Sequence, residues 1–201
     1  MEGMLAVLPG ERLGPVECLG HPWYQGVVPA ARVLDEKAFR QILRYCKQKP
    51  LVKAVLLVVA SQLTVYPKEI LGLFRELDGG CSGVISREAW GEACASWGKT
   101  EAKAAFGLMD LNGDGQVSFS EFVAAGLIGH PDLVVEHMPA VFSILSRGAQ
   151  EVSAEKLVAA LSGGQCDTEV PALAAQFLEH FAGKFVTATA LSSYVAESLC
   201  C

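Results

Sequence analysis

Residues 110–121 place oxygen-bearing groups at alternate positions, a spacing that suits a hard divalent cation. Asp110, Asn112 and Asp114 offer side-chain oxygens from positions 1, 3 and 5 of the stretch. Glu121, at position 12, can offer two oxygens at once, and Gly115 permits the sharp turn at position 6. Calcium takes six to eight oxygen ligands in proteins. The predicted ligands are Asp110, Asn112, Asp114, Gln116 through its carbonyl, Ser118 through a water, and Glu121.

The stretch resembles the calcium loop of an EF-hand, because each position that the motif specifies carries a fitting residue. Val117, at position 8, is the aliphatic residue that we expect to pair with a neighbouring loop. The alternative is an ordinary polar turn between two helices. The agreement of the specified positions and the helical pattern on both sides favour the calcium site, with Ca²⁺ as the bound ion.

A second loop, Asp78–Ala89, keeps the outline of the first but lacks the acid at position 12. Asp78, Gly83 and Ile85 stand in register with Asp110, Gly115 and Val117. Position 3 is Gly80 and position 12 is Ala89, while Glu88 lies one residue too early. We therefore predict a structural unit in which Asp78 and Ser82 mark a weak or lost metal site.

Two further units complete an internal repeat of helix, loop and helix. They centre on Ser146–Lys156 and on a shorter stretch near Gly183–Leu191, and neither loop is expected to bind calcium. Apolar residues recur at helical spacing through most of the chain. The predicted fold class is all-α, with two lobes of paired EF-hand units preceded by a long amphipathic junction helix.

The segment ahead of the repeats is basic and amphipathic. Seven cations and two acids lie between Arg32 and Lys53, and apolar residues interleave with them. Such helices are typical targets of calmodulin-like lobes, although a solvated helix with one apolar face is the simpler alternative. Pro50 predicts a break or kink between Lys49 and Leu51. The candidate regulatory residues of this junction are Arg40, Arg44, Lys47, Lys49 and Lys53.

The first 25 residues resemble the end of a eukaryotic protein kinase catalytic domain, on the strength of Arg12 and His21-Pro22-Trp23. Leu8 replaces the acid usual in that pattern. Together with the basic junction and four EF-hand units, this order resembles the calcium-dependent protein kinases of plants and apicomplexan parasites. The expected domains are residues 1–30, a kinase-end remnant; 31–65, an autoinhibitory junction; 66–129, the N-terminal lobe; and 130–201, a degenerate C-terminal lobe.

In that family the junction blocks the kinase at rest, and calcium makes the lobes grip or rearrange it. The resemblance therefore implies a signalling module whose partner is a Ser/Thr kinase catalytic domain, in cis or in trans. The chain carries no Gly-rich loop and no V-A-I-K, H-R-D or D-F-G motif, so we expect no enzymatic activity of its own. Two alternatives stay open, namely a free-standing calmodulin-like adaptor and an EF-hand scaffold without switching.

Charge and cysteine content restrict the classes of partner and the cellular compartment that we expect. A net charge of −6 argues against nucleic acid as a partner. Seven cysteines without a C-x-x-C pair indicate a reducing compartment, and we expect a cytoplasmic protein. The longest apolar run is too short for a membrane span, so no membrane partner is expected unless Cys200 and Cys201 are lipidated.

Overall fold

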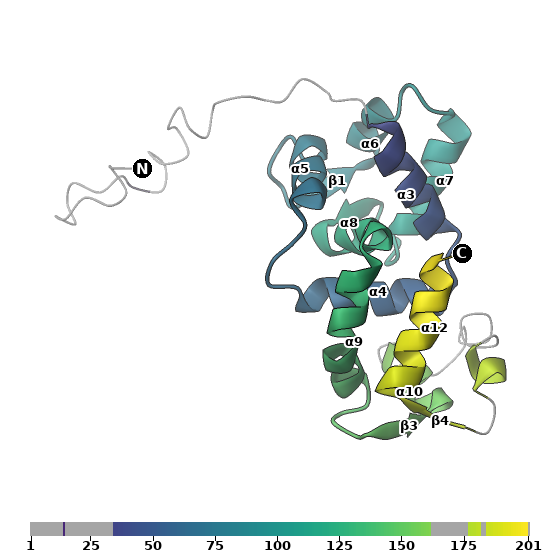
Figure 1. Ribbon diagram of the computed structural model, residues 1–201. Helices are drawn as coiled ribbons and strands as arrows, with labels where there is room; N and C mark the ends of the chain where they lie inside the picture. The colour runs from purple at the N-terminus through teal and green to yellow at the C-terminus, as the bar shows by residue number, and fades with distance from the viewer. Residues whose placement is uncertain (1–13, 15–33, 162–176, 182–183, 201) are drawn as a thin grey trace.

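The chain folds into short helices joined by loops and by two small pairs of strands (Figure 1). The computed structural model describes residue 14 and residues 34–161, 177–181 and 184–200. The prediction of an all-α fold is confirmed, since every strand within these residues is three residues long. The helices are α3 (Glu36–Cys46), α4 (Pro50–Gln62), α5 (Lys68–Leu77), α6 (Arg87–Ala93), α7 (Lys99–Met109), α8 (Phe119–Gly126), α9 (Pro131–Leu145), α10 (Ala154–Leu161) and α12 (Ala188–Cys200), with a 3-10 turn, η3 (Leu127–Gly129).

Each strand lies in a loop between two helices and pairs with the strand of a neighbouring loop. Strand β1 (Val84–Ser86) runs antiparallel to β2 (Gln116–Ser118), and Ile85 lies opposite Val117. Strand β3 (Glu151–Ser153) pairs in the same way with β4 (Phe185–Thr187). The central aliphatic residues are buried, because the side of each ladder that they occupy faces the helices. The four helix–loop–helix units therefore associate as first with second and third with fourth.

The junction consists of two helices and not of one long helix. Helix α3 begins at the N-cap Asp35, whose carboxylate accepts a hydrogen bond from Ala38 N, and it ends at Cys46. Helix α4 begins at Pro50, in the first helical position, where a missing N–H costs nothing. A break was predicted between Lys49 and Leu51; it is present but lies slightly earlier, at residues 47–49, so that Pro50 begins the next helix.

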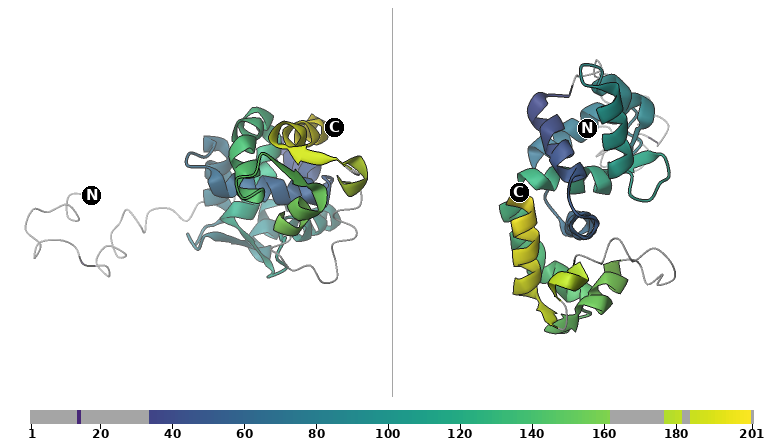
Figure 2. Two further views of the ribbon diagram at one scale, coloured as in Figure 1. Left: turned by 90° about the horizontal axis from the view of Figure 1, so that it is seen from below. Right: turned by 90° about the vertical axis from the view of Figure 1, so that its right-hand side faces the viewer.

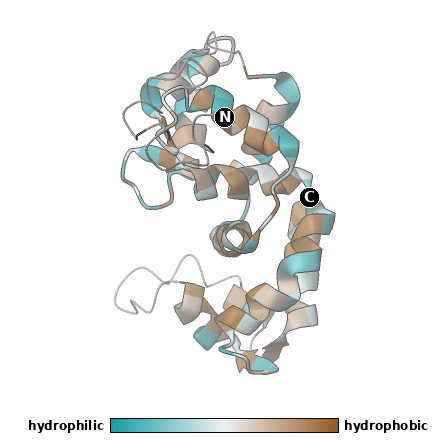
Figure 3. Cartoon of the chain, turned by 90° about the vertical axis from the view of Figure 1, so that its left-hand side faces the viewer, coloured by the Kyte–Doolittle hydropathy of each residue, from teal (hydrophilic) through white to brown (hydrophobic). Residues whose placement is uncertain are grey.

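Helix α4 lies in the middle of the molecule and is nearly apolar all round. Val52, Val55, Leu56 and Val59 are fully buried. The helix packs against α8 on one side and against α9 and α10 on the other. Viewed along its axis, α4 sits between the part formed by α3 and α5–α8 and the part formed by α9, α10 and α12 (Figures 2 and 3). It is a shared core element, which explains why its sequence lacks a polar face.

Within the described part of the chain, no helix combines the length and the apolarity that crossing a bilayer requires.

Candidate calcium site

The loop after α7 is closed by its own first side chain. Asp110 caps the end of α7, and its Oδ1 accepts a hydrogen bond from Asp114 N at 3.1 Å. The other oxygen, Oδ2, accepts from Gly115 N at 3.0 Å. Gly115 has φ +84°, a conformation that residues with a Cβ rarely adopt. The residues that the motif specifies therefore hold the backbone of the loop in shape through their own hydrogen bonds, without help from an ion.

The next two donor side chains lie on the exposed surface of the loop. Asn112 Nδ2 donates to Asp114 Oδ2 at 2.9 Å, and Asn112 Oδ1 accepts from Asp114 N at 3.0 Å. Gln116 N donates to Asp114 Oδ1 at 2.9 Å and begins strand β2. These contacts gather the oxygens of positions 3 and 5 and the backbone of position 7 on one short arc of the loop.

Glu121 joins the two ends of the loop. Its Oε1 accepts from Leu111 N at 2.9 Å and from Asn112 N at 3.4 Å. Its Oε2 accepts from Ser118 N at 2.8 Å and from Ser118 Oγ at 2.7 Å, which forms a capping box at the start of α8. A carboxylate has about four lone-pair sites. All the acceptor capacity of Glu121 is thus used by backbone and hydroxyl donors of the loop.

Glu121 is also a buried carboxylate, with an exposed fraction of 4%. Among the described residues, no basic side chain forms an ion pair with it. Burying an ionised group without a counter-charge is costly. Hydrogen bonds from the loop reduce that cost here, and a bound cation would reduce it further.

The donor set fits calcium, because it contains only oxygens and includes the carboxylates of Asp110, Asp114 and Glu121. In the described residues, no three His, Cys, Asp or Glu side chains converge into a ready-made metal-binding group. The two carboxylate oxygens of Glu121 accept instead from Leu111 N and from Ser118 Oγ. The assignment of single ligands, with Gln116 through its carbonyl and Ser118 through a water, stays a prediction.

The Asp78 loop has the same construction without the acid at position 12. Asp78 is buried, and its two oxygens accept from Ser82 N at 2.8 Å and from Gly83 N at 2.7 Å. Ser82 Oγ donates to Asp78 as well, at 2.9 Å. At position 12, Ala89 contributes only its backbone N–H, which donates to the N-cap Ser86. Asp78 and Ser82 thus hold each other, which supports the prediction of a structural loop.

The third and fourth loops offer still fewer oxygens. Ser146 occupies the place of the first aspartate, and its Oγ donates to Ala149 O at 2.8 Å. Lys184 N donates to Phe181 O at 2.9 Å in the fourth loop, part of which lies outside the described residues. These loops keep their strand pair, and that neither binds calcium stays a prediction.

The five junction cations do not share one face. Arg40 is exposed and pairs with Glu36 on its own helix. Arg44 Nη2 donates to Leu199 O at 2.7 Å, and Lys49 Nζ lies 4.9 Å from the ring centre of Tyr194, so both reach α12. The other two are Lys47, which is exposed, and Lys53, which is buried.

Lys53 is the unusual member of this group. Its ammonium lies 5.1 Å from the ring centre of Tyr45, and only 6% of the residue is exposed. Desolvation lowers its pKa from the ordinary 10.5. The unfolded chain therefore binds this proton more tightly than the folded chain, so stability rises with pH between the lowered pKa and 10.5. Lys53 is therefore a buried residue of the core and not a surface charge.

Tyr45 is a residue of interest that the sequence analysis did not single out. It is fully buried, and its hydroxyl has no hydrogen-bond partner in the described structure. Burial raises the pKa of its phenol, and the charges of Cys46 and Glu121 add to the effect. Tyr45 belongs to α3 and Glu121 to α8, so the junction lies within electrostatic range of the predicted calcium ligand. The sequence did contain a signal for its burial, because Tyr45 lies three residues after the apolar Ile42 and so on the same face of α3.

Several predicted features lie outside the described residues. These are the kinase-like elements at Arg12 and His21-Pro22-Trp23, with Leu8, the side chain of Cys200, and Cys201. The domain boundaries likewise stay a prediction.

Comparison with known proteins places these observations in a class. An EF-hand domain pair matches residues 67–125, which span the Asp78 and Asp110 loops and their helices. Residues 67–125 are thus an EF-hand pair, and Ca²⁺ is the ion that the chain binds, as the Asp110 loop predicts.

A longer part of the chain, 61% to 79% of it, is similar to calcium-dependent protein kinases. Calcium-dependent protein kinase 31 of Arabidopsis thaliana is 30% identical over 61% of this chain and 26% of its own length. Calcium-dependent protein kinase 33 of Arabidopsis thaliana is 27% identical over 79% of the chain and 32% of its own length. Calcium-dependent protein kinase 19 of Oryza sativa subsp. japonica is 26% identical over 72% and 28%. The chain thus spans about a third or less of these relatives.

Proposed function

We propose that this chain is a calcium-sensing regulatory module that controls a Ser/Thr protein kinase through its junction, α3 and α4. One observation carries the proposal. Glu121, the acid at position 12 of the intact loop, belongs to α8, and α8 is the helix against which both α3 and α4 pack. A change at the calcium loop therefore acts directly on the element that holds the junction.

The coupling follows from the acceptor count of Glu121. Its four hydrogen bonds, to Leu111 N, Asn112 N, Ser118 N and Ser118 Oγ, use the lone pairs that a bidentate ligand must present to a metal. Glu121 cannot keep all four and also ligate through both oxygens. Calcium binding and the capping of α8 by Glu121 are therefore linked. The start of α8 has two states, one capped by Glu121 and one in which Glu121 ligates calcium, and the ion favours the second.

A change at α8 would be transmitted to the junction helices α3 and α4. Phe39 on α3 stacks on Trp97 with ring centres 4.8 Å apart, and Trp97 Nε1 donates to Leu34 O at 3.1 Å. A shift of α8 changes the support beneath α3 and α4 and so changes whether the basic segment can reach a kinase active site. The kinase partner, in cis or in trans, is inferred from the named relatives, and the module itself is proposed to have no catalytic activity.

The burial of α4 supports regulation over the adaptor alternative. A free-standing calmodulin-like adaptor needs an apolar groove for helices of other proteins. Here Leu56 and Val59 of α4 are already fully buried against the chain's own helices.

Trp97 provides the first test. In a Trp23→Phe, Trp90→Phe background, calcium is expected to shift the emission of Trp97, because its stacking on Phe39 reports the docking of α3. Glu121→Gln should abolish the shift, and Glu88→Gln, an exposed acid in the partner loop, should leave it unchanged. An emission spectrum that ignores calcium while calorimetry records binding would refute the coupling.

The second test addresses the kinase. The full chain is added to the catalytic domain of a calcium-dependent protein kinase, and phosphorylation of a peptide is measured with and without calcium. Inhibition that calcium relieves is the expected result. Activity that is the same with and without the chain would remove the regulatory proposal while leaving calcium binding intact.

A further inference from the structure

A cavity of about 540 Å³ lies where the break in the junction meets the C-terminal helix. Arg44 at the end of α3 and Lys47 and Lys49 in the break form one wall. His180 and Tyr194 contribute to the other, and Tyr194 belongs to α12. This volume is in the range of small-ligand sites. The cavity is separate from the calcium loop, since none of its described lining residues belongs to residues 110–121.

The cavity is positively charged although the chain as a whole carries −6. Arg44, Lys47 and Lys49 face Glu197, which is the one carboxylate among the described lining residues. No ion pair between Glu197 and these cations is present in the described structure. An excess of positive charge is thus left for an external anion.

Two of the cations are held in place. Arg44 Nη2 donates to Leu199 O, which leaves the remaining guanidinium N–H groups available. Lys49 lies over the face of Tyr194, and His180 is 5.2 Å from the same ring. Cations fixed by contacts that are not ion pairs lose less side-chain entropy when an anion binds.

The start of α4 adds to the field. This helix of 13 residues begins at Pro50, and its N-cap Lys49 makes no side-chain hydrogen bond to the first turn. The N-terminal end of a helix carries partial positive charge, which favours an anion such as phosphate even though Pro50 itself has no N–H. Lys49 is both this N-cap and a lining residue of the cavity.

We propose that this cavity binds a small anion bearing several phosphate groups, and that the anion ties the junction to α12. Three cations from one wall and a helix N-terminus match a ligand of high charge density better than a single carboxylate. Because the walls come from segments about 130 residues apart in sequence, the bound anion stabilises their contact and raises the temperature of unfolding.

Inositol hexakisphosphate is a suitable probe, titrated calorimetrically into the full chain in calcium-free buffer so that the probe does not compete for calcium. Saturable binding to one site is expected. The double variant Lys47→Gln, Lys49→Gln should weaken binding about tenfold or more, because two nearby charges are removed. Glu197→Gln should strengthen it.

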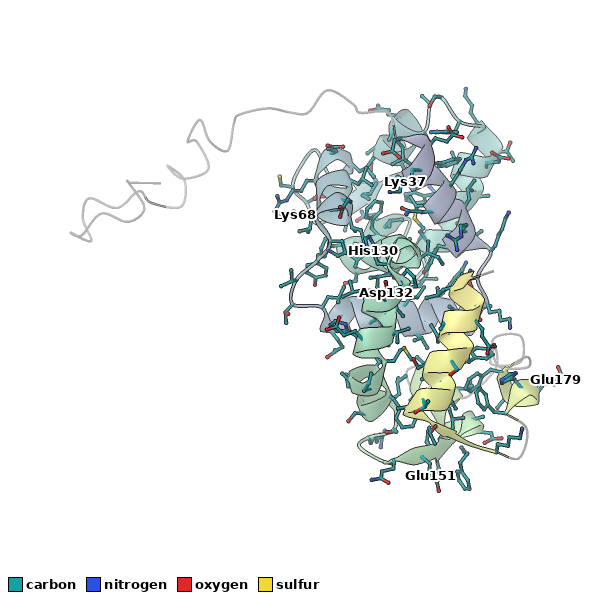
Figure 4. The ribbon with its side chains drawn as sticks, in the orientation of Figure 1. Lys37, Lys68, His130, Asp132, Glu151 and Glu179 are labelled. Carbon is teal, nitrogen blue, oxygen red and sulfur yellow. The ribbon has the colours of Figure 1, made fainter. Side chains whose placement is uncertain are left out.

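The control is Lys37→Gln, Lys68→Gln, which removes the same charge from exposed positions on α3 and α5. Figure 4 shows both residues on the side of the molecule away from Glu179, the neighbour of His180. Equal weakening in both double variants, or no saturable binding, would overturn the proposal by reducing it to general charge attraction.

A vesicle arm identifies the source of the phosphate. Vesicles of phosphatidylcholine with added phosphatidylinositol bisphosphate are sedimented with the chain, again without calcium. Binding of the soluble probe alone assigns the site to a free anion, and binding of vesicles that Lys47→Gln, Lys49→Gln abolishes assigns it to a lipid headgroup. The calcium and kinase tests do not depend on either result.

Discussion

The Asp78 and Asp110 loops have nearly the same backbone and different chemistry. In each, the first aspartate accepts hydrogen bonds from N–H groups four and five residues later, and a serine caps the next helix. Gly83 and Gly115 have φ values of +83° and +84°. The loops differ at position 12, where the first has Ala89 and the second has Glu121.

The comparison teaches that the loop backbone forms with or without an acid at position 12. Asp78 and Asp110 shape their loops through backbone hydrogen bonds, which persist whether or not an acid closes the ring. Glu121 is the one predicted ligand of the Asp110 loop that is buried, with 4% of the residue exposed, and it lies on α8, which packs against the junction helix α3. A loop can therefore lose its ion and keep its place in the fold, as the strand pair of β1 and β2 illustrates.

Removing the acid should have the largest effect. Glu121→Gln is expected to weaken calcium binding by about 100-fold or more, because even groups that only support a ligand contribute 10–100-fold. Isothermal titration calorimetry measures the change. Glu88→Gln, in the partner loop, is the matched control and should bind as the wild type does. Calcium affinity that survives Glu121→Gln would show that another site holds the ion.

The shared backbone predicts equal strain in both loops. Gly83→Ala and Gly115→Ala should each lower the calcium-free stability by about 1–2 kcal/mol, the cost of placing a Cβ in the left-handed region. Urea unfolding gives both values. A cost in only one of the two loops would mean that their backbones are not equivalent, which contradicts the comparison.

Introducing the missing acids into the Asp78 loop should enable it to bind calcium. Ala89→Glu combined with Gly80→Asp supplies positions 12 and 3, and we expect a second calcium to bind at least about tenfold more tightly than any residual binding at Asp78. Calorimetric stoichiometry should rise from one to two. Ala95→Glu, together with Gly80→Asp, adds the same charge at an exposed site outside the loop and should leave the stoichiometry at one.

The smallest effect is expected at the helix caps. Ser86→Ala and Ser118→Ala should each cost about 1 kcal/mol in calcium-free unfolding, because Ser86 Oγ accepts from Ala89 N and Ser118 Oγ from Glu121 N. Ser118 also donates to Glu121, so its replacement alone should change calcium affinity. Calcium titration of both variants tests this, and an equal change in both would contradict a special link between Ser118 and Glu121.

Local patterns predicted much of the fold. Helical periodicity predicted a chain that is helical through most of its length, because an amphipathic helix repeats its apolar face every three to four residues. The loop motif selected Asp110 and Glu121 as candidate calcium ligands from spacing alone, and that assignment stays a prediction. Pro50 predicted a break in the junction. In the structure the break lies at residues 47–49, because proline is favoured at the start of a helix and Pro50 begins α4.

Long-range packing could not be predicted in the same way. The apolar sequence of α4 does not say that it lies between two groups of helices, since burial on all sides depends on partners distant in the chain. Nor does any local pattern bring Arg44 to Leu199 or Tyr45 near Glu121. Sequence determined which residues can ligate calcium and where helices form, through short-range geometry. Only the tertiary structure decided which helix carries the ligand to the junction, because contacts between distant segments follow from the packing of the whole core.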